Sequence, residues 1–554
     1  MSLRPFLSLL SRFSSAQTAS LGLLGASLLL STASCFDTDQ GLPPPERRFY
    51  FPTGVAVSPG GKALFVINSD FDLQYRAGTA QALDLRRLRA MVNRLRSPFV
   101  GEAGAPLDTS GVDCQAGGLG TNSSSDSLLY PGPCAPIDLD APPDHQGSLI
   151  RASVDIGAFG ADVQVVRRPP SPGETTTEAR LLIPVRGDPS LTWLTIDDDT
   201  GDGIQSFRLD CGQGSGRRCS DAHRAGTDRT TNLRDLTLPE EPFELAVNER
   251  TDAVLVTHQT SGAVSLLLNG WSSGDPGLLT RCAKLPPSPV LSFVLGGLPS
   301  GVTGTAALPM PRLATLYPEE IPYAPAFLVS YRNAAQIDVI RYYDDCLSAP
   351  ARPFLTLTGR SGITTNAGGF DSRSIAVDPS LRKSCEAACA DSDKECLAGC
   401  AGVPVDIYVA NRTPPSLLVG KATGSVSQLG VNDSVFFGTT IPLAQGASRV
   451  RLGHIVDTRG AKRPRAFILC FDARLLYVYD PEAAAIEAVI TTGRGPSAIA
   501  FDPGIGTPDG ASNYAYLAHF TDSYLAVLDL DMRHPATYLT FIASVGIPTP
   551  PRES

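Results

Sequence analysis

The sequence predicts an all-β protein, a β-propeller of seven blades, with six or eight blades as the alternatives. A two-strand pattern recurs along the chain, and its apolar runs have the length and composition of strands. Each copy opens in a polar or proline-rich turn, and its second strand ends abruptly on a polar residue. Four copies are clear, and they run from Pro52 to Asn68, from Pro242 to His258, from Ser372 to Asn411 and from Pro496 to His519.

Three weaker copies lie between the clear ones, at residues 161–186, 326–331 and 448–471. In most copies a third strand follows, and a fourth strand precedes the next copy. Four strands per unit and about seven units describe a propeller, whose radial closure leaves only short sheet edges. Each unit has roughly 70 residues, against about 40 to 45 in a compact blade. The excess therefore lies in loops.

Several of the second strands share a short motif. The strand ends are Tyr408-Val-Ala-Asn411, Phe65-Val-Ile-Asn68 and Leu255-Val-Thr-His258, and Ser58-Pro-Gly-Gly-Lys62 forms a turn. In these motifs the chain resembles the bacterial YVTN-type propellers of the surface-layer and lactonase-like superfamily. The resemblance covers most of residues 48–545 and implies an architecture that carries many unrelated functions.

The N-terminus has the pattern of an export signal. Arg4 and Arg12 precede an apolar run at residues 21–30, which is too short to span a membrane as a helix. Small residues then lead to Cys35, which resembles the lipidated cysteine of a bacterial lipobox, although Thr32 departs from that pattern. We expect a signal peptide over residues 1–34 and a palmitate-bearing Cys35. Ordinary signal cleavage nearby is the alternative.

The export signal also predicts how the rest of the chain is divided and where the protein is located. Residues 35–47, rich in proline, form a tether, residues 48–545 form the propeller domain, and residues 546–554 form a C-terminal tail. The expected location is the cell envelope, with the chain anchored by lipid and facing the periplasm or the cell surface. The sequence does not distinguish the inner from the outer membrane.

Eleven cysteines follow Cys35, mostly in glycine-, proline- and serine-rich insertions. In an oxidising compartment we expect disulfides there. The expected pairs are Cys114–Cys134, Cys211–Cys219, Cys282–Cys346, Cys385–Cys400 and Cys389–Cys396. The last two pairs would close a small helical hairpin in the fifth blade, although four thiolates in this spacing also suit zinc. Cys470 lies in an apolar run and is expected to be unpaired in the core.

Long insertions gather in the loops that follow the first and third strands of a blade. They comprise residues 87–148, 209–234, 271–290, 343–354 and 380–403. Loops of this class emerge on one face of a propeller, so one face is predicted to be large and cross-linked. The arginine-rich helix expected near residues 83–96 either packs along the rim or contacts lipid headgroups.

Polar residues at the strand ends and strand entries of the other face form a predicted ring around the central channel. The ligand-binding candidates are Arg186, His258, Tyr331, Asn411, His519 and Arg449. Convergent polar groups on a rigid scaffold favour binding, whereas turn hydrogen bonds would explain the same residues without a ligand.

Signals for catalysis and for metals are weak. No nucleophile elbow, zinc-protease motif, phosphate loop or dinucleotide fingerprint occurs in a fitting context. The residues to test for catalysis are His258, Glu244, Arg373 and His519. Asp198 and Asp202 precede Gly203 with the opening spacing of a calcium loop, but Leu209 stands where the final acid is expected. An acidic hairpin turn is the alternative, and no other cofactor is expected.

The net charge of −10 provides no basic stripe for nucleic acid. The leading hypothesis is a monomeric, membrane-anchored envelope lipoprotein whose propeller binds a protein or a glycan. The alternative is a lactonase-like or other hydrolase that uses the polar mouth of the channel.

Overall fold

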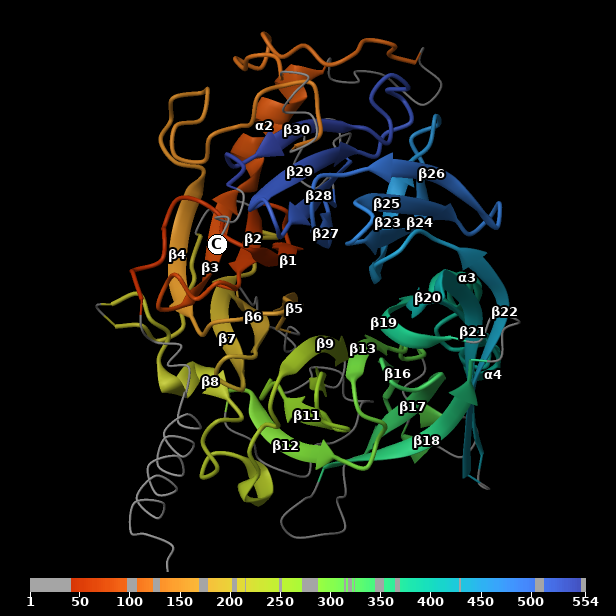
Figure 1. The fold of residues 1–554 in the computed structure, drawn as a ribbon. Helices are drawn as coiled ribbons and strands as arrows, with labels where there is room; N and C mark the ends of the chain where they lie inside the picture. The colour runs from red at the N-terminus through yellow and green to blue at the C-terminus, as the bar shows by residue number, and fades with distance from the viewer. Residues whose placement is uncertain are drawn as a thin grey trace, which may run out of the picture.

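The computed structural model describes residues 41–96, 107–122, 130–168, 178–201, 207–214, 216–248, 252–271, 287–312, 315–316, 321–322, 324–343, 353–363, 369–427, 430–503 and 513–549. Seven four-stranded antiparallel sheets surround a central axis (Figure 1). Each sheet is contiguous in sequence and runs from the inner to the outer strand in chain order. The prediction of a seven-bladed propeller is confirmed.

The strands of the first four blades have the following bounds. Blade 1 contains β1 (Pro52–Val57), β2 (Ala63–Asn68), β3 (Gly78–Asp84) and β4 (Ile150–Ile156), and blade 2 contains β5 (Gln164–Arg167), β6 (Glu178–Val185), β7 (Ser190–Asp197) and β8 (Arg224–Ala225). Blade 3 contains β9 (Pro242–Asn248), β10 (Ala253–His258), β11 (Val264–Leu268) and β12 (Val290–Leu295), and blade 4 contains β13 (Val302–Ala307), β16 (Ala326–Tyr331), β17 (Gln336–Tyr343) and β18 (Phe354–Gly362).

Three further blades complete the ring. Blade 5 contains β19 (Phe370–Asp378), β20 (Val405–Thr413), β21 (Pro415–Ser427) and β22 (Gly430–Pro442), and blade 6 contains β23 (Ala447–Val456), β24 (Lys462–Cys470), β25 (Leu475–Asp480) and β26 (Ala485–Thr491). Blade 7 contains β27 (Pro496–Phe501), β28 (Tyr514–His519), β29 (Tyr524–Asp529) and β30 (Phe541–Val545). A small hairpin of β14 (Thr315–Leu316) and β15 (Ile321–Pro322) follows β13.

Burial explains why the second strands read as continuous apolar runs. β2, β10 and β28 are buried along their whole length, because neighbouring blades cover both faces of each sheet. The outermost strand β26 has no fully buried residue and alternates between exposed and half-buried positions.

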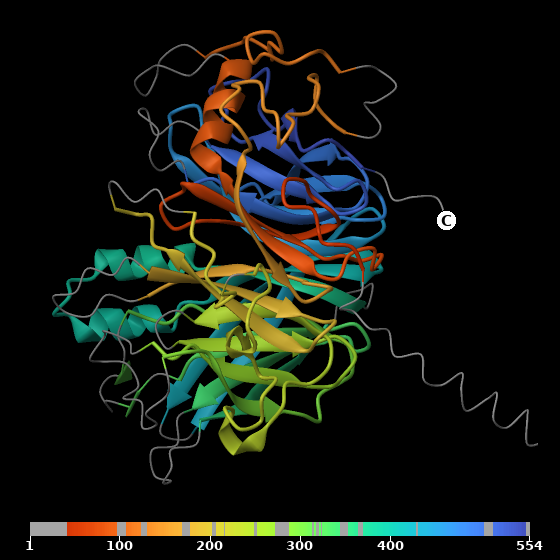
Figure 2. The same cartoon turned by 90° about the vertical axis from the view of Figure 1, so that its left-hand side faces the viewer.

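The two faces of the ring differ as predicted. Loops after the first and third strands emerge on one face, which we call the insertion face, and the other face is the compact face. The insertion face carries the hairpin of α3 (Ser380–Ala388) and α4 (Lys394–Ala401), between β19 and β20. Figure 2 shows these teal helices on the side opposite the red loops of the N-terminal segment.

Disulfides brace the loops of the insertion face. The bridges Cys114–Cys134 and Cys211–Cys219 lie in blades 1 and 2, and Cys385–Cys400 and Cys389–Cys396 close the α3–α4 hairpin. The hairpin cysteines are thus paired with each other, in the arrangement expected for disulfides. Cys470 is a free buried cysteine, and Cys282 and Cys346 lie outside the described residues.

Residues 209–234 do not form one insertion. The two-residue strand β8 lies within them, so residues 226–241 return across the compact face to β9. A strand this short has no room for an alternating apolar pattern, which is why the sequence does not reveal it. None of the described helices is long and apolar enough to cross a membrane.

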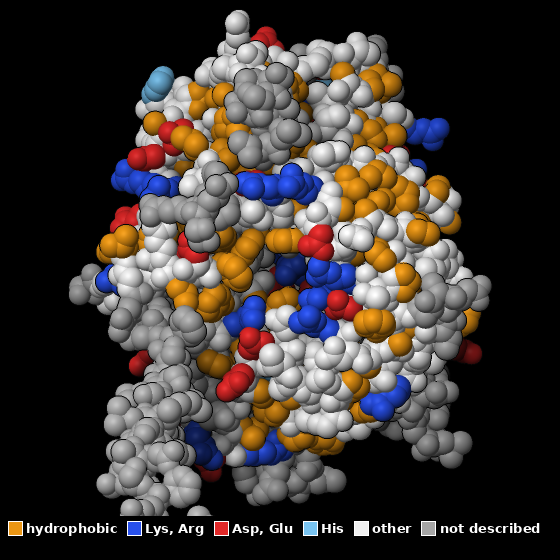
Figure 3. Space-filling view, in the orientation of Figure 1, with side chains coloured by type: hydrophobic (Ala, Val, Ile, Leu, Met, Phe, Trp, Pro, Cys, Tyr) orange, Lys and Arg blue, Asp and Glu red, His pale blue; other side chains and the backbone are white. Residues whose placement is uncertain are grey.

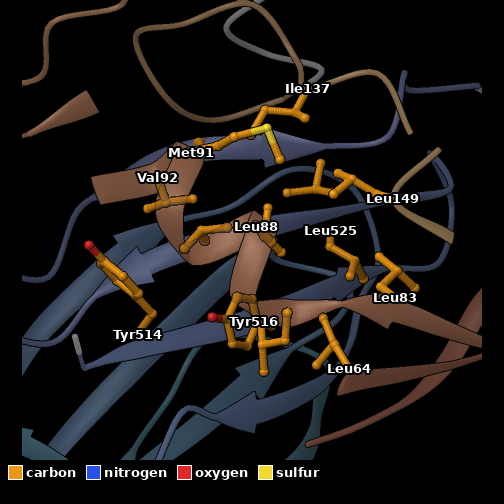
Figure 4. Close-up of a cluster of buried hydrophobic side chains, with 14 of the residues drawn as sticks. Leu64, Leu83, Leu88, Met91, Val92, Ile137, Leu149, Tyr514, Tyr516 and Leu525 are labelled. Atoms are coloured by element: carbon orange, nitrogen blue, oxygen red, sulfur yellow. The ribbon is translucent and has the colours of Figure 1, made fainter. Parts of the chain in front are cut away.

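The first insertion closes the ring. Its helix α2 (Leu85–Leu95) begins at Asp84, whose side chain accepts a hydrogen bond from the Arg87 amide. The buried face of α2 packs between blades 1 and 7, in a cluster that includes Leu64, Leu88 and Tyr516 (Figure 4). Farther along the insertion, Ile137 hydrogen-bonds the backbone beside β30 and so extends the outer edge of blade 7.

Candidate functional site

The compact face is hollowed at its centre, where the inner strands begin. Figure 3 shows arginine, acidic and apolar side chains around this hollow. A cavity of about 330 Å³ opens there, and we call it the mouth pocket. Five phenylalanines contribute to its lining: Phe71, Phe159, Phe243, Phe471 and Phe520. They come from blades 1, 3, 6 and 7 and from the connection between blades 1 and 2.

The aromatic rings contact one another around Phe71. Its ring centroid lies 6.2 Å from that of Phe159 and 5.2 Å from that of Phe520. Phe520 in turn lies 5.2 Å from Phe51 and 6.0 Å from Phe471. These distances are typical of packed aromatic pairs. Phe71 is nevertheless 56% exposed, so the cluster presents an apolar surface to whatever enters the mouth pocket.

Strained backbone supports part of this lining. Phe51 and Phe159 adopt φ values of 48° and 60°, and Asp70 adopts 53°. Bulky side chains rarely occupy this left-handed region, and such positions cluster at binding sites. In the loop of residues 69–77, which carries Phe71, Asp70 and Leu73 both adopt this conformation. Burial also raises the pKa of Asp70 to about 7.

A repeated β-bulge positions the polar side chains of the lining. Six of the seven inner strands carry one extra residue near their start. In three blades the extra residue, Thr53, Ser448 or Ser497, lines the mouth pocket. A bulge redirects a side chain out of the sheet. These hydroxyls donate to the backbone carbonyls of Gly160, Leu469 and Pro52, respectively.

Two polar groups of the lining retain hydrogen-bonding capacity. The Arg186 Nη2 atom donates to Glu241 at 2.8 Å, whereas its buried Nε has no hydrogen-bond partner among the described residues. The buried Ser69 hydroxyl likewise has none among them. Buried polar groups without partners are rare in native proteins, so both are candidates for contacts with a ligand.

The channel beside the mouth pocket contains a balanced set of charges. Arg449 donates to Asp162 at 2.8 Å, and Arg451 donates to Glu244 at 2.8 Å. The backbone amide of Thr305 also donates to Glu244. Burial raises the pKa of Glu244, and the neighbouring Arg451 opposes that rise. Two carboxylates and two guanidinium groups thus offset one another.

The two predicted histidines are buried within their blades. His258 hydrogen-bonds the Glu240 carbonyl at 3.1 Å and the Ser265 hydroxyl at 2.8 Å. His519 stacks on Tyr524 with ring centroids 4.3 Å apart. Burial lowers the pKa to about 4 for His258 and about 3 for His519. Neither residue belongs to the lining of the mouth pocket.

The remaining predicted residues divide between the pocket and the blades. Arg186 and Arg449 line the mouth pocket. Tyr331 donates to Asp338 at 2.7 Å, and Asn411 accepts from Ser372 and donates to the Pro414 carbonyl. Arg373 is the bulged residue of β19 and pairs with Asp371. Two of the six predicted ligand-binding residues thus line the mouth pocket, whereas Tyr331 and Asn411 hydrogen-bond within their own blades.

Of the two predicted calcium ligands, Asp198 directly follows β7. The Asp198 carboxylate accepts hydrogen bonds from Arg167 and from Thr200, which agrees with the acidic-turn alternative. The next residue, Asp199, accepts from the Ser58 hydroxyl and so joins blade 2 to a turn of blade 1. Asp202 and Cys35 lie outside the described residues.

Sequence reasoning missed most of the aromatic lining. The pattern of polar strand ends does not predict Phe71, Phe159, Phe243 or Phe520. A usable signal exists, because Phe471 and Phe520 both directly follow the second strand of their blades. The position after the second strand is occupied by phenylalanine in blades 6 and 7. A phenylalanine at this turn position, where polar residues are usual, indicates an aromatic surface on the compact face.

Comparisons with known proteins do not identify a family for this chain, so the fold is assigned from its strand topology. No family model and no curated protein matches the chain. Among solved structures, a putative 6-phosphogluconolactonase from Bacteroides uniformis is similar at 12% identity over 78% of this chain and 96% of that one, with a TM-score of 0.41. Hydrazine synthase from Kuenenia stuttgartiensis is similar at 9% identity over 87% and 96%, with a TM-score of 0.39. These similarities carry no argument about activity.

Proposed function

We propose that the chain is a lipid-anchored binding protein of the cell envelope, and that its mouth pocket holds a ligand with an apolar body. The five phenylalanines around the cavity of about 330 Å³ carry this proposal. Ligand sites are typically concave and mostly apolar, with a few oriented polar groups. The left-handed backbone at Phe159 is consistent with a binding role, because such conformations are enriched at ligand sites.

A lactonase-like hydrolase is less well supported. Such an enzyme needs a general acid or base within reach of its substrate. The channel acids Asp162 and Glu244 are paired with Arg449 and Arg451. Asp70, His258 and His519 are buried and do not belong to the pocket lining. The described residues therefore favour binding over hydrolysis.

The path of the chain gives the proposed anchor a direction. Leu42 pairs with Tyr75, in the β2–β3 loop of the compact face. Even when extended, the interval from Cys35 to Gly41 reaches about 20 Å at most. A lipid on Cys35 would thus hold the compact face near the membrane, and the disulfide-braced insertion face would point away, toward a protein or glycan partner.

A neutral fluorescent probe tests the binding role. We expect N-phenyl-1-naphthylamine to bind the full chain carrying Cys35→Ser. This substitution removes the proposed site of acylation, so the protein can be studied without detergent, which would itself take up the probe. Phe71→Ala should weaken this binding about tenfold, because the central ring of the cluster is lost. Phe436→Ala is the matched control, since Phe436 is an exposed phenylalanine on the distant outer strand β22.

Two results would count against the proposal. Equal fluorescence enhancement with the parent chain and with Phe71→Ala would place the probe elsewhere. Hydrolysis of a lactone by the parent chain, abolished by Glu244→Gln, would establish the enzymatic alternative.

A further inference from the structure

We infer that the ligand of the mouth pocket is an amphiphilic anion, with an apolar body against the phenylalanines and a carboxylate- or sulfonate-like group bound by Arg186 and Ser69. This inference rests on the proposed binding function of the pocket. It adds the charge and the polarity of the ligand, which the aromatic lining alone does not determine.

The unpaired groups of the pocket determine what the ligand must offer. The buried Nε of Arg186 carries a hydrogen that no described residue accepts. This N–H can only donate, so its partner must be an acceptor. The Ser69 hydroxyl, also buried and unpaired, belongs to the lining of the same pocket and provides a second donor. Hydrogen bonds from a guanidinium group to an anion are about twice as strong as neutral ones.

The fold holds Arg186 ready for this contact. Arg186 directly follows β6, and its Nη2 is held by Glu241, which lies in the connection to blade 3. This pairing fixes one edge of the guanidinium and leaves the Nε unused. Such preorganisation lowers the entropy lost on binding. A cationic ligand is disfavoured, because both Arg186 and Arg449 line the pocket.

Glu241 limits the strength of the site. Its carboxylate is about one-third exposed and neutralises the guanidinium that the ligand would use. A neutral residue at position 241 should therefore raise affinity for an anion. A gain of affinity is informative here, because a variant that folds poorly would lose binding rather than gain it.

Two matched probes test the inference. 8-Anilinonaphthalene-1-sulfonate and N-phenyl-1-naphthylamine share a ring system and differ by the sulfonate. We expect Arg186→Met to weaken binding of the sulfonate about tenfold, as for a lost charge-assisted hydrogen bond. Glu241→Gln should tighten it severalfold. Neither substitution should change the affinity for the neutral probe by more than about twofold.

Arg332→Met is the control. Arg332 directly follows the second strand of blade 4, as Arg186 does in blade 2, and it faces Asp371 at 3.6 Å. It does not line the mouth pocket, so both probes should bind this variant normally. The inference fails if Glu241→Gln and Arg186→Met change both probes alike or leave the sulfonate unaffected. Failure of the neutral probe to bind the parent chain would instead overturn the proposed function itself.

Discussion

The polar residues that end the second strands fasten the blades internally. Asn68 donates to Thr79 at 3.0 Å, and Tyr331 donates to Asp338 at 2.7 Å, in each case on the third strand of the same blade. His258 makes the corresponding contact with Ser265. Each link satisfies a polar group that would be costly to bury unpaired. The abrupt polar ending seen in the sequence is therefore a structural feature of most blades.

The buried histidines predict how stability depends on pH. Burial lowers the pKa of His519 to about 3, below its value in an unfolded chain. The unfolded state therefore binds the proton more readily, and stability is lost as the pH falls below about 6.5. Replacement by an apolar ring should remove this penalty. Between pH 7.5 and pH 5, His519→Phe should lose roughly 2 kcal/mol less stability than the parent chain.

Urea denaturation midpoints at the two pH values would measure the difference. His145→Phe serves as the control, because His145 lies in a loop of the insertion face and shows no such burial. The assignment of His519 would be wrong if both variants and the parent chain lost stability equally.

At this scale the sequence reveals the type of residue but not the direction of its side chain. The spacing of polar strand ends shows that they lie on one face. Asn411 hydrogen-bonds within its blade, whereas Arg449 lines the mouth pocket, and the pattern of polar residues in the sequence does not distinguish the two. The bulges of the inner strands can be recognised in the strand register but not in the sequence, as for Ser448, the extra residue where β23 pairs with β24.

Among the larger elements, α2 adds contacts where the ring closes. Blades 1 and 7 pack directly through β1, β27 and β28, and α2 with its insertion packs against both blades. Arg96, just beyond α2, contacts Asp529 at 2.6 Å and the Tyr514 hydroxyl at 2.8 Å, and Arg89 contacts Asp502 at 2.5 Å. The sequence correctly suggested an amphipathic helix. Lipid contact is a poor description of it, because Arg89 and Arg96 are buried and paired.

Removing one partner of this contact should destabilise the fold. Arg96→Met leaves the Asp529 carboxylate buried without its cation, which typically costs about 3–5 kcal/mol. Arg47→Met is the control, because its contact with Asp140 is largely exposed and should be worth less than about 1 kcal/mol. Urea denaturation would compare the two. Equal losses would show that α2 does not hold blades 1 and 7 together.

Seen as a whole, the molecule has two faces that differ in loop length and in disulfide content. Loop lengths in the sequence predicted this difference, since a four-stranded meander places alternate loops on opposite faces. The mouth pocket could not be predicted in the same way. Its lining joins Phe71 to Phe471 and Phe520, which are about 400 positions away in the chain and meet only because the ring closes.

The position of the proposed lipid anchor predicts which face of the propeller lies toward the membrane. With the lipid on Cys35 and Leu42 held on the compact face, a tryptophan at position 71 should lie closer to the membrane than one at position 381, on α3. In vesicles with dansyl-labelled headgroups, energy transfer should be clearly more efficient from Phe71→Trp than from Leu381→Trp. Trp193 and Trp271 add the same background to both. Adding Cys35→Ser should abolish energy transfer from both positions. Stronger transfer from position 381 would show that the insertion face lies toward the membrane, which would contradict the proposed orientation.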